Sequence, residues 1–435
     1  MLLTETVKAV GLDVALSQAL GPWRKPATVH DPGKIIVDLA LSLGLGGDGL
    51  NDARLLRAEP AVFGLVASDP TISRTISVLA GQATKVLPAI RQARAQVRRR
   101  AWGLAGRASP QAEATASTPM IIDVDATLIT SHSDKQGAGP TWKKGYGFHP
   151  LVAFIDHGQE GTGEPLAVML RKGNAGSNTV ADHQQVINQA LAQLPSKERK
   201  NVLIRTDGAG GTKGLATWLT RRGLNYSLGF TLPEQTPELY QLLPQMAWTP
   251  AVTADGDIRD GAEVAEFTRL LDMTGWPANM RVIVRRERPH PGAQLRFDDV
   301  DGFRLTAFVT NTRIGQHQHL EARHRTRARV EDRIRASKDL GLAKMPFHRF
   351  AQNQIWCEIV TLACELIAWM QTLALHGGHA RRWEPKTLRH RLFTIPAVIA
   401  RKARQTWLHL GRHSPFADLI SQGVHRLRHQ ALVPT

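Results

Sequence analysis

MIIDVDATLIT, residues Met120–Thr130, is the stretch from which the fold is worked out. Apolar and polar side chains alternate along it with a period of two, which predicts a β-strand with one apolar and one polar face. The polar face carries Asp123, Asp125 and Thr127. Residues 107–118, just before the strand, are rich in Ala, Ser, Thr, Gln and Pro, a composition typical of a linker. A folded unit is therefore expected to begin at residue 119.

The segments that follow alternate between strands and helices. Two strands in hairpin-like succession are predicted first, and then a helix, a strand, a helix and a strand. This order is typical of an α/β fold with a mixed sheet and helices on its faces. Asp207 comes at the carboxyl end of one predicted strand, where open α/β sheets place their functional sites. The predicted strands are 148–156, 165–170, 201–206 and 224–230, and the predicted helices are 179–194 and 212–222.

Residues 231–302 break this pattern. Five prolines precede a basic strand, Met280–Glu287, and a polar turn then leads to another strand, Phe303–Thr310. We interpret residues 231–302 as a β-rich insertion in the α/β unit, which resumes at residue 303. A long apolar helix over residues 352–375 follows and is expected to pack on the sheet.

The segment His324–Lys338, HRTRARVEDRIRASK, predicts a helix, because it has helix-forming residues, no internal Gly or Pro, and Gly341 as a C-cap. At about 3.6 residues per turn, one face of this helix holds a carboxylate among three groups that bind phosphate. The alternative is an exposed helix with ion pairs along it, which is the usual state of helices rich in Arg and Glu. The residues of this face are His324, Arg327, Glu331 and Lys338.

Three carboxylates from these elements, Asp125, Asp207 and Glu331, are hard oxygen ligands of the kind that Mg²⁺ or Mn²⁺ prefers. Two such ions can activate a hydroxyl and stabilise the leaving oxygen during in-line attack on a phosphodiester. The basic residues of the helix would then bind the flanking phosphates. Asp123 shares a strand face with Asp125, so the first ligand is one of these two. Each aspartate taken alone is better explained as a strand-end or turn residue.

Composition points to a nucleic-acid partner. The chain has 435 residues, which predicts two or three domains. Its net charge of +17 favours a polyanion partner, nucleic acid first and an anionic membrane surface second. No signal peptide is visible, and the apolar stretch 355–375 is interrupted by Glu358 and Glu365, unlike a membrane span. A cytoplasmic protein with access to DNA is expected, and the resemblance described below places it with the bacterial nucleoid. The two cysteines, Cys357 and Cys364, are expected to be core thiols.

Both ends of the chain are basic. Residues 1–106 predict a helical domain, in which the arginines at 91, 94, 98, 99 and 100 would lie along a phosphate backbone or on a solvated face. Residues 379–435 predict a basic helical region.

Three motifs of the chain resemble those of the DDE transposases of bacterial insertion sequences, and more closely those of the thirteen-eighty family of these elements. They are D-x-T at Asp125–Thr127, T-D-G at Thr206–Gly208, and a signature Y-x2-R-x3-E-x6-K. The signature has its full spacing here, with His324 in place of the tyrosine. The resemblance covers most of the chain. The set of motifs is fairly specific, although no single motif is.

This resemblance implies an RNase H-like catalytic core interrupted by the β-rich insertion. It implies Mg²⁺-dependent cleavage of double-stranded DNA at terminal inverted repeats, with Mn²⁺ able to substitute, and strand transfer into target DNA by the freed 3′-hydroxyl. The protein would act as a homodimer in a synaptic complex. The metal ligands would be Asp125, Asp207 and Glu331, and the phosphate contacts would be His324, Arg327 and Lys338.

In relatives with such an insertion, cleavage can pass through a DNA hairpin, with an aromatic residue holding a flipped base. Trp248 and Trp276 are the candidates here, and core packing is the alternative for both. The predicted organisation is a helical N-terminal DNA-binding or assembly domain (1–106), a linker (107–118), a catalytic core in two parts (119–230 and 303–378), the insertion (231–302) and a basic helical C-terminal region (379–435).

Two other functions are compatible with the same residues. A decayed copy would bind DNA without catalysis, and a structure-specific nuclease on the same fold would cut DNA without joining it. The complete carboxylate set argues against the first. The large insertion and the two basic flanking regions argue against the second, because a simple nuclease needs less surface than end recognition and synapsis require.

Overall fold

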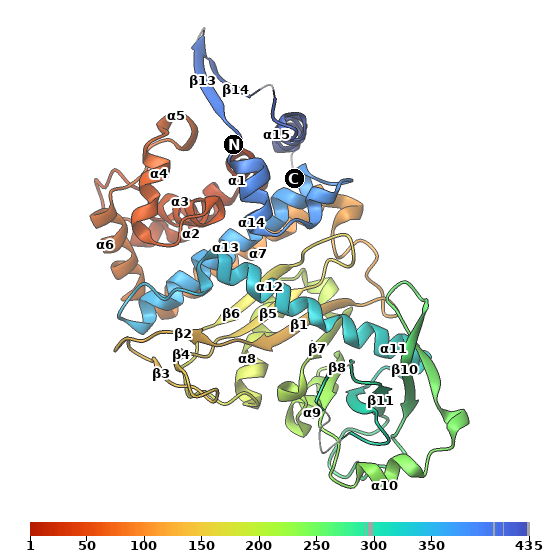
Figure 1. The fold of residues 1–435 in the computed structure, drawn as a ribbon. Coiled ribbons are helices and arrows are strands. Elements are labelled where there is room, and N and C mark those ends of the chain that lie inside the picture. The colour runs from red at the N-terminus through yellow and green to blue at the C-terminus, as the bar shows by residue number, and fades with distance from the viewer. Residues whose placement is uncertain (291, 295–298, 403–404, 412, 433–435) are drawn as a thin grey trace.

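A nine-stranded mixed sheet runs through the middle of the computed structural model (Figure 1), which describes residues 1–290, 292–294, 299–402, 405–411 and 413–432. Within these residues the strand order is β6-β5-β1-β7-β8-β12-β11-β10-β9. The predicted α/β class with a mixed sheet is confirmed. The strands are β1 (Met120–Ala126), β5 (Leu151–Ile155), β6 (Glu164–Met169), β7 (Val202–Thr206), β8 (Asn225–Phe230), β9 (Thr249–Val252), β10 (Ile258–Glu266), β11 (Arg281–Glu287) and β12 (Arg304–Thr310).

β1 is an interior strand, and its two faces differ as the period of two predicts. It pairs in parallel with β7 and antiparallel with β5. Ile122 and Val124 are buried in a core that includes residues of helices α8 (Val180–Ala192) and α9 (Lys213–Arg221). Asp123 and Asp125 therefore belong to the opposite face of the sheet.

That opposite face is covered by the long helix α13 (Phe350–Ala374) together with residues of α12 (Arg329–Ser337). By length and composition, α13 is the one described helix that satisfies the criteria for a membrane span, but 94% of its apolar window is buried inside the protein. Cys357 and Cys364 lie in this helix as buried free thiols, as predicted. α13 is thus packed as the central helix of a core.

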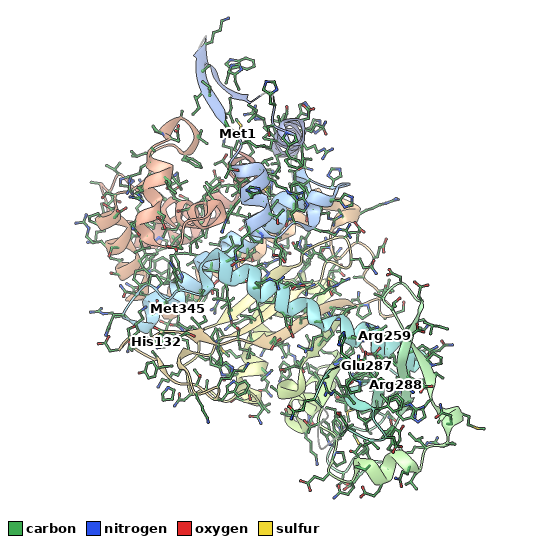
Figure 2. All side chains as sticks on the ribbon, in the orientation of Figure 1. Met1, His132, Arg259, Glu287, Arg288 and Met345 are labelled. Atoms are coloured by element: carbon green, nitrogen blue, oxygen red, sulfur yellow. The ribbon has the colours of Figure 1, made fainter. Side chains whose placement is uncertain are left out.

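The strands of the predicted insertion extend the main sheet. β12 pairs antiparallel with β8, and β11, β10 and β9 follow as successive antiparallel neighbours. The basic side chains of this extension are largely paired with acidic ones: Arg259 pairs with Glu287, both labelled in Figure 2, and Arg281 lies 2.8 Å from Glu266. The insertion, which also contains α10 (Thr236–Gln241), is therefore joined to the core by continuous backbone hydrogen bonding.

Each edge strand of this sheet contains a proline, Pro165 in β6 and Pro250 in β9. Proline has no backbone N–H to donate to a further strand. At the β6 edge, the carbonyls of Pro165 and Leu166 also accept hydrogen bonds from Arg98 (2.9 Å) and Arg94 (3.2 Å). Neither edge offers an uninterrupted row of backbone donors.

Seven helices precede the sheet and share a core with it. Their apolar residues belong to the same buried cluster as α13 and as residues of β5 and β6. The boundary predicted at residue 106 therefore does not separate two hydrophobic cores in the described part of the chain. The helices are α1 (Leu2–Val10), α2 (Leu12–Leu20), α3 (Pro32–Leu45), α4 (Ala53–Arg57), α5 (Pro60–Phe63), α6 (Asp69–Ala80) and α7 (Ala83–Ala105).

Two arginines of α7 point into the protein, contrary to both expectations for them. Arg94 and Arg98 are completely buried. Arg94 lies 2.7 Å from Glu358 and 2.6 Å from Glu365, while Arg98 pairs with Glu365 and lies 3.2 Å from Glu164. The reason is that two carboxylates of the apolar helix α13 are buried and need cationic partners.

The C-terminal region is not wholly helical, so this part of the prediction is wrong. After the short α14 (Pro385–Leu388), strands β13 (Ala397–Lys402) and β14 (Gln405–Leu410) form an antiparallel hairpin that projects from the body (Figure 1). The sequence here contains β-branched and aromatic residues, which favour strands. Helix α15 (Ala417–Ala431) then packs on α1, where Arg428 lies 3.6 Å from Glu5.

A small second sheet follows β1 directly. Its strand order is β2-β4-β3, with β2 (Ile129–Thr130), β3 (Gly139–Pro140) and β4 (Tyr146–Phe148). The turn that joins β3 to β4 covers residues 141–145. We refer to Thr141–Gly145 below as the β3–β4 turn.

Candidate active site

The register of two parallel strands brings Asp125 and Asp207 to the same edge of the sheet. Val124 of β1 lies opposite Thr206 of β7, so the next residue of each strand is an aspartate. The Asp207 side chain caps the short helical turn Gly208–Gly210, accepting hydrogen bonds from the backbone N–H groups of Ala209 (3.1 Å) and Gly210 (3.4 Å). This capping holds the carboxylate at the end of β7.

Gly211 explains why the sequence after Asp207 is rich in glycine. A Cβ atom at this position would lie 1.7 Å from the carbonyl oxygen of Gly229 in the neighbouring strand β8. Only glycine allows this close approach of two backbones. The tight turn keeps Asp207 beside the sheet edge.

The helix predicted over residues 324–338 is present but is not one regular helix. α11 (His317–Arg325) and α12 are joined by a 3₁₀ turn at Thr326–Ala328, and α12 ends in a wider turn at Lys338–Leu342. Gly341 has a φ of 109°, the left-handed conformation expected of a C-cap glycine. The four signature residues are therefore distributed over three successive helical segments and one terminal turn.

Arg327 and Glu331 lie near Asp125 and Asp207, at the carboxyl ends of β1 and β7. The Arg327 Nη1 atom is 3.3 Å from Oδ2 of Asp125, and Glu331 is exposed to solvent. Burial and the negative charge of Asp207 raise the pKa of Asp125 to about 6, with a further contribution from Glu331, while Arg327 and the N–H of Ala126 act against this rise. Asp207 and Glu331 are therefore close enough to influence Asp125.

His324 lies apart from this edge. Its ring stacks on Phe308 with 4.3 Å between centroids, and its Nδ1 atom is 2.8 Å from Oγ of Ser227. Burial, together with the positive charges of Arg205 and Arg327, holds the pKa of His324 well below its usual range. A neutral, stacked imidazole anchors the helix to the sheet, which differs from the predicted contact with phosphate.

Lys338 is half-buried at the end of α12. Burial and the neighbouring ammonium group of Lys143 lower its pKa. Lys143 belongs to the β3–β4 turn, so this turn lies near the last residue of the signature.

The structure distinguishes Asp123 from Asp125. Asp123 is completely buried and its Oδ1 lies 2.5 Å from Arg205, while its Oδ2 lies 2.7 Å from Arg333. Both arginines also contact Asp156, at 3.1 and 2.7 Å. These four residues form a buried ion network that ties β1, β7 and the end of β5 to α12. Asp123 thus has a structural role within this network, whereas Asp125 lies outside the network and pairs with Arg327.

Arg205, Arg333 and Asp156 are the residues that sequence reasoning missed. Arg205 stands among apolar residues of a buried strand, next to Leu203 and Ile204, and a charged residue there signals a buried partner. The partners themselves come from distant segments, so the sequence does not identify them.

The two candidate tryptophans of the insertion differ in burial. Trp248 is 6% exposed and packs against Tyr240 and Phe267, as the core-packing alternative states. Trp276 is half-buried, with its ring edge-on to Phe230 at 5.5 Å between centroids. Its loop is tied to the start of α9 by Lys213, which donates to the carbonyl of Thr274 at 2.8 Å.

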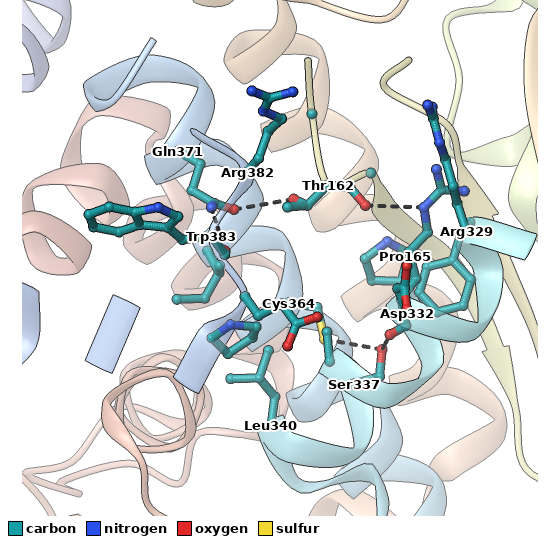
Figure 3. Close-up of a pocket in the computed structure, with 18 of the residues that line it drawn as sticks. Thr162, Pro165, Arg329, Asp332, Ser337, Leu340, Cys364, Gln371, Arg382 and Trp383 are labelled. Carbon is teal, nitrogen blue, oxygen red and sulfur yellow. Dashed lines mark hydrogen bonds between the residues drawn. The ribbon is translucent and has the colours of Figure 1, made fainter. Parts of the chain in front are cut away.

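A pocket lies between α12 and α13 (Figure 3). Arg329, Asp332 and Ser337 line it from α12, and Cys364 and Gln371 line it from α13. Hydrogen bonds already join its walls, including Thr162 Oγ1 to Gln371 Oε1 at 3.2 Å. The three carboxylates lie outside this pocket.

The residues at the sheet edge suit a hard divalent cation in type but are not assembled as a metal site. In the described part of the chain, no three His, Cys, Asp or Glu side chains converge closely enough to hold a metal ion. Asp125 nevertheless faces two further carboxylates and has a guanidinium as its cationic neighbour. Oxygen donors that repel one another in this way fit Mg²⁺ or Mn²⁺, which would relieve the repulsion.

Comparisons with known proteins identify the family of the chain. Residues 1–432 match the family model described as transposase DDE domain group 1. No curated protein sequence matches the chain. Among solved structures, the chain is similar to a piggyBac transposase, determined by cryo-electron microscopy as a synaptic complex with hairpin DNA, at 10% identity and a TM-score of 0.41 over 100% of this chain and 82% of that one. Because the family model spans nearly the whole sequence, the chain belongs to the family of DDE transposases.

Proposed function

We propose that this protein cleaves and joins phosphodiester bonds of double-stranded DNA during transposition, with Asp125, Asp207 and Glu331 as the ligands of Mg²⁺ or Mn²⁺. The observation that carries the proposal is the register of β1 and β7, which sets Asp125 beside Asp207 at one sheet edge. Glu331, on α12, is near enough to raise the pKa of Asp125. Membership of the transposase family supports DNA as the substrate.

The bound metal ions would activate the attacking hydroxyl and stabilise the leaving oxygen. Asp207, held by two backbone N–H groups, is the most rigidly placed of the three ligands. Arg327 neutralises Asp125 in the absence of metal and would turn to a DNA phosphate when metal binds. Lys338 would bind a second phosphate. We assign His324 to positioning α11 through Ser227 and Phe308.

Finer features of the proposal rest on the signature and its spacing. We propose that the substrate is the terminal inverted repeats of an element of the thirteen-eighty type, that target DNA is joined to the freed 3′-hydroxyl, and that two copies act together on nucleoid DNA in the cytoplasm. The core would be RNase H-like, and residues 1–106 would serve DNA binding or assembly. If a hairpin intermediate forms, Trp276 is the better candidate for holding a flipped base, because Trp248 is buried.

A cleavage and joining assay tests the proposal. The wild type, Asp207→Ala and Glu331→Gln are incubated with a labelled duplex carrying the repeats that flank the gene, with Mg²⁺ or with Mn²⁺. Asp332→Asn is the matched control, because Asp332 is the next residue of α12, is exposed, and pairs only with Arg335 in the described structure. Cleaved and joined products should form with the wild type and the control and be lost in the other two variants.

The competing functions predict different products. A structure-specific nuclease would give cleavage without joining. A DNA-binding relic would retain the duplex on a gel and leave it uncut with either metal. Full activity of both Asp207→Ala and Glu331→Gln would contradict the ligand assignment.

A further inference from the structure

The β3–β4 turn is a tight, hydrogen-bonded element beside the candidate site. The N–H of Thr141 donates to the carbonyl of Gly145 at 2.8 Å, and the N–H of Lys144 donates to the carbonyl of Thr141 at 3.0 Å. The Oγ1 atom of Thr141 accepts a further hydrogen bond from the N–H of Gly145 at 3.2 Å. Its residues, Thr-Trp-Lys-Lys-Gly, combine one large aromatic ring with two cations.

Close backbone contacts fix the small sheet that carries this turn. A Cβ atom at Gly147 would lie 1.9 Å from the carbonyl oxygen of Ile129, and one at Gly173 would lie 2.2 Å from that of Gly139. At these points β4 approaches its sheet neighbour β2, and the segment after β6 approaches β3, more closely than a side chain would allow. The turn is consequently presented on a rigid base.

The base is also attached to the segment that follows the catalytic helix. The N–H of Gln136 donates to the carbonyl of His348 at 2.8 Å, and Lys135 donates to the carbonyl of Met345. Figure 2 shows the same proximity, with His132 and Met345 labelled side by side. At its other end, three residues separate Asp125 from β2. The turn is thus coupled at both ends to elements that carry site residues.

The side chains of the turn are displayed to solvent. Trp142 is 68% exposed, more than any other tryptophan of the described structure. The ammonium group of Lys143 lies 5.0 Å from the centroid of its ring. Among the described residues, Lys143, Lys144 and Lys338 have no carboxylate within ion-pair distance, whereas the arginines of the insertion largely do. This leaves an exposed ring and three uncompensated cations at one place.

We propose that the β3–β4 turn is a DNA-binding element, in which the Trp142 ring stacks on an unpaired base beside the cleaved bond. Lys143 and Lys144 bind the phosphates that flank this base and continue the positive surface begun by Lys338. The inference rests on the proposed function in that DNA must occupy the carboxylate edge. The inference adds a contact between the turn and the DNA strand that leaves the carboxylate edge.

The chemistry of the turn fits a single-stranded segment better than a closed duplex. A planar aromatic ring stacks on any base whose face is free, and such stacking is independent of sequence. Paired bases within a duplex have no free face, except at an end. Cleavage and strand exchange both produce unpaired nucleotides close to the reacting phosphate. The single-stranded segment that the turn would bind is therefore generated at the candidate site itself.

Binding measured in the presence of a chelator tests this proposal without requiring chemistry. The probes are a labelled duplex with flush ends and the same duplex with a run of unpaired thymidines at one 3′ end. Trp142→Ala should weaken binding of the second probe about tenfold and of the first less than about twofold, and Trp142→Phe should retain most of the affinity. The double variant Lys143→Ala/Lys144→Ala should weaken the binding of both probes. It should also reduce the slope of log affinity against log salt concentration by the amount expected for about two phosphate contacts.

Matched controls come from distant exposed residues. Trp407→Ala removes an exposed tryptophan of β14, and Lys197→Ala/Lys200→Ala removes an exposed lysine pair near the start of β7, at the end of that strand away from Asp207. Neither should change the ratio of the two affinities. Circular dichroism of each variant checks that it is folded.

The proposal is overturned if the wild type does not distinguish the two probes, or if Trp142→Ala leaves their ratio unchanged. Failure of the proposed function is a separate result, since that function is judged by products in the presence of metal and by Asp207 and Glu331. A Trp142 variant that shows the wild-type ratio of the two affinities and no cleavage would therefore contradict only the DNA-binding role of the turn.

Discussion

Asp123 and Asp125 lie two residues apart on the same face of β1, yet their surroundings are opposite. Two arginines hold the completely buried Asp123, while Asp125 faces two further carboxylates at the sheet edge. The arginines stabilise the ionised form of Asp123, and the neighbouring carboxylates destabilise the ionised form of Asp125. The charge of Asp123 therefore stabilises the fold, whereas the charge of Asp125 belongs to the candidate site.

Replacing Asp123 by Asn should destabilise the protein. The variant keeps the shape of the side chain but leaves Arg205 and Arg333 to share Asp156 alone. Removing one partner from a buried ion network costs about 3–5 kcal/mol, and we expect a loss of this order in the free energy of unfolding. Urea denaturation followed by circular dichroism measures it. Asp125→Asn is the control, and equal losses in the two variants would contradict the distinction.

Asp125 should make the stability of the metal-free protein depend on pH. Its pKa is raised from 3.8 to about 6, so the folded protein binds this proton more tightly than the unfolded chain does. The stability that this group contributes is therefore present below about pH 4, is lost as the pH rises through about 6, and stays lost above it.

Asp125→Asn removes this pH dependence. Above about pH 6, in chelator, the variant should be more stable than the wild type by about 1–3 kcal/mol, and the difference should vanish below about pH 4. Urea denaturation across this pH range measures the effect. A variant that is less stable than the wild type at pH 7 would show that Arg327 outweighs the repulsion from Asp207 and Glu331.

At the scale of elements, two arginines of α7 share one carboxylate of α13. Glu365 is the shared partner of Arg94 and Arg98, and all three side chains are completely buried. Glu365→Ala should cost about 3–5 kcal/mol, because it leaves two guanidinium groups in the core with fewer acceptors. Arg99→Ala, an exposed arginine of the same helix, should change stability by less than about 0.5 kcal/mol. Thermal and urea unfolding would show the difference, and a neutral Glu365→Ala would contradict it.

Periodicity predicted the elements well where one pattern dominates. The alternation of Met120–Thr130 gave β1 and its polar face, and the helix formers of 324–338 gave a helical segment with Gly341 at its end. The 3₁₀ turn at Thr326–Ala328 was not predicted, because contacts of Thr326 with Arg205 on the sheet, rather than helix propensity, determine the backbone there. The hairpin of β13 and β14 was missed because its many basic residues were interpreted as a helical face.

For the candidate site, the alternation of the first strand indicated Asp125, a strand end indicated Asp207, and helical spacing indicated Arg327 and Glu331. Their roles stay predictions. Spacing gave no means of seeing that Ser227 and Phe308, from two different strands, hold His324 away from solvent. Residues that act through partners from distant segments need the three-dimensional structure.

At the scale of the whole molecule, the N-terminal helices and the sheet should unfold as one cooperative unit. They share a core around α13, which has apolar residues on all sides. A chain that lacks residues 1–106 should therefore expose the surface of α13 and aggregate instead of folding as a separate catalytic domain. Solubility and circular dichroism of this fragment test the prediction, and calorimetry of the full chain should show a single transition. A soluble, folded fragment would support the predicted domain boundary.

The prolines at the two sheet edges have a consequence for how copies of this protein meet. A sheet with open edges invites a second molecule to add its own strand, and the same addition, repeated, builds fibres. Pro165 and Pro250 interrupt both edges, and arginines of α7 occupy carbonyls of β6. Copies of this protein at high local concentration are thereby kept from polymerising through their largest sheet, and any association between them is left to other surfaces.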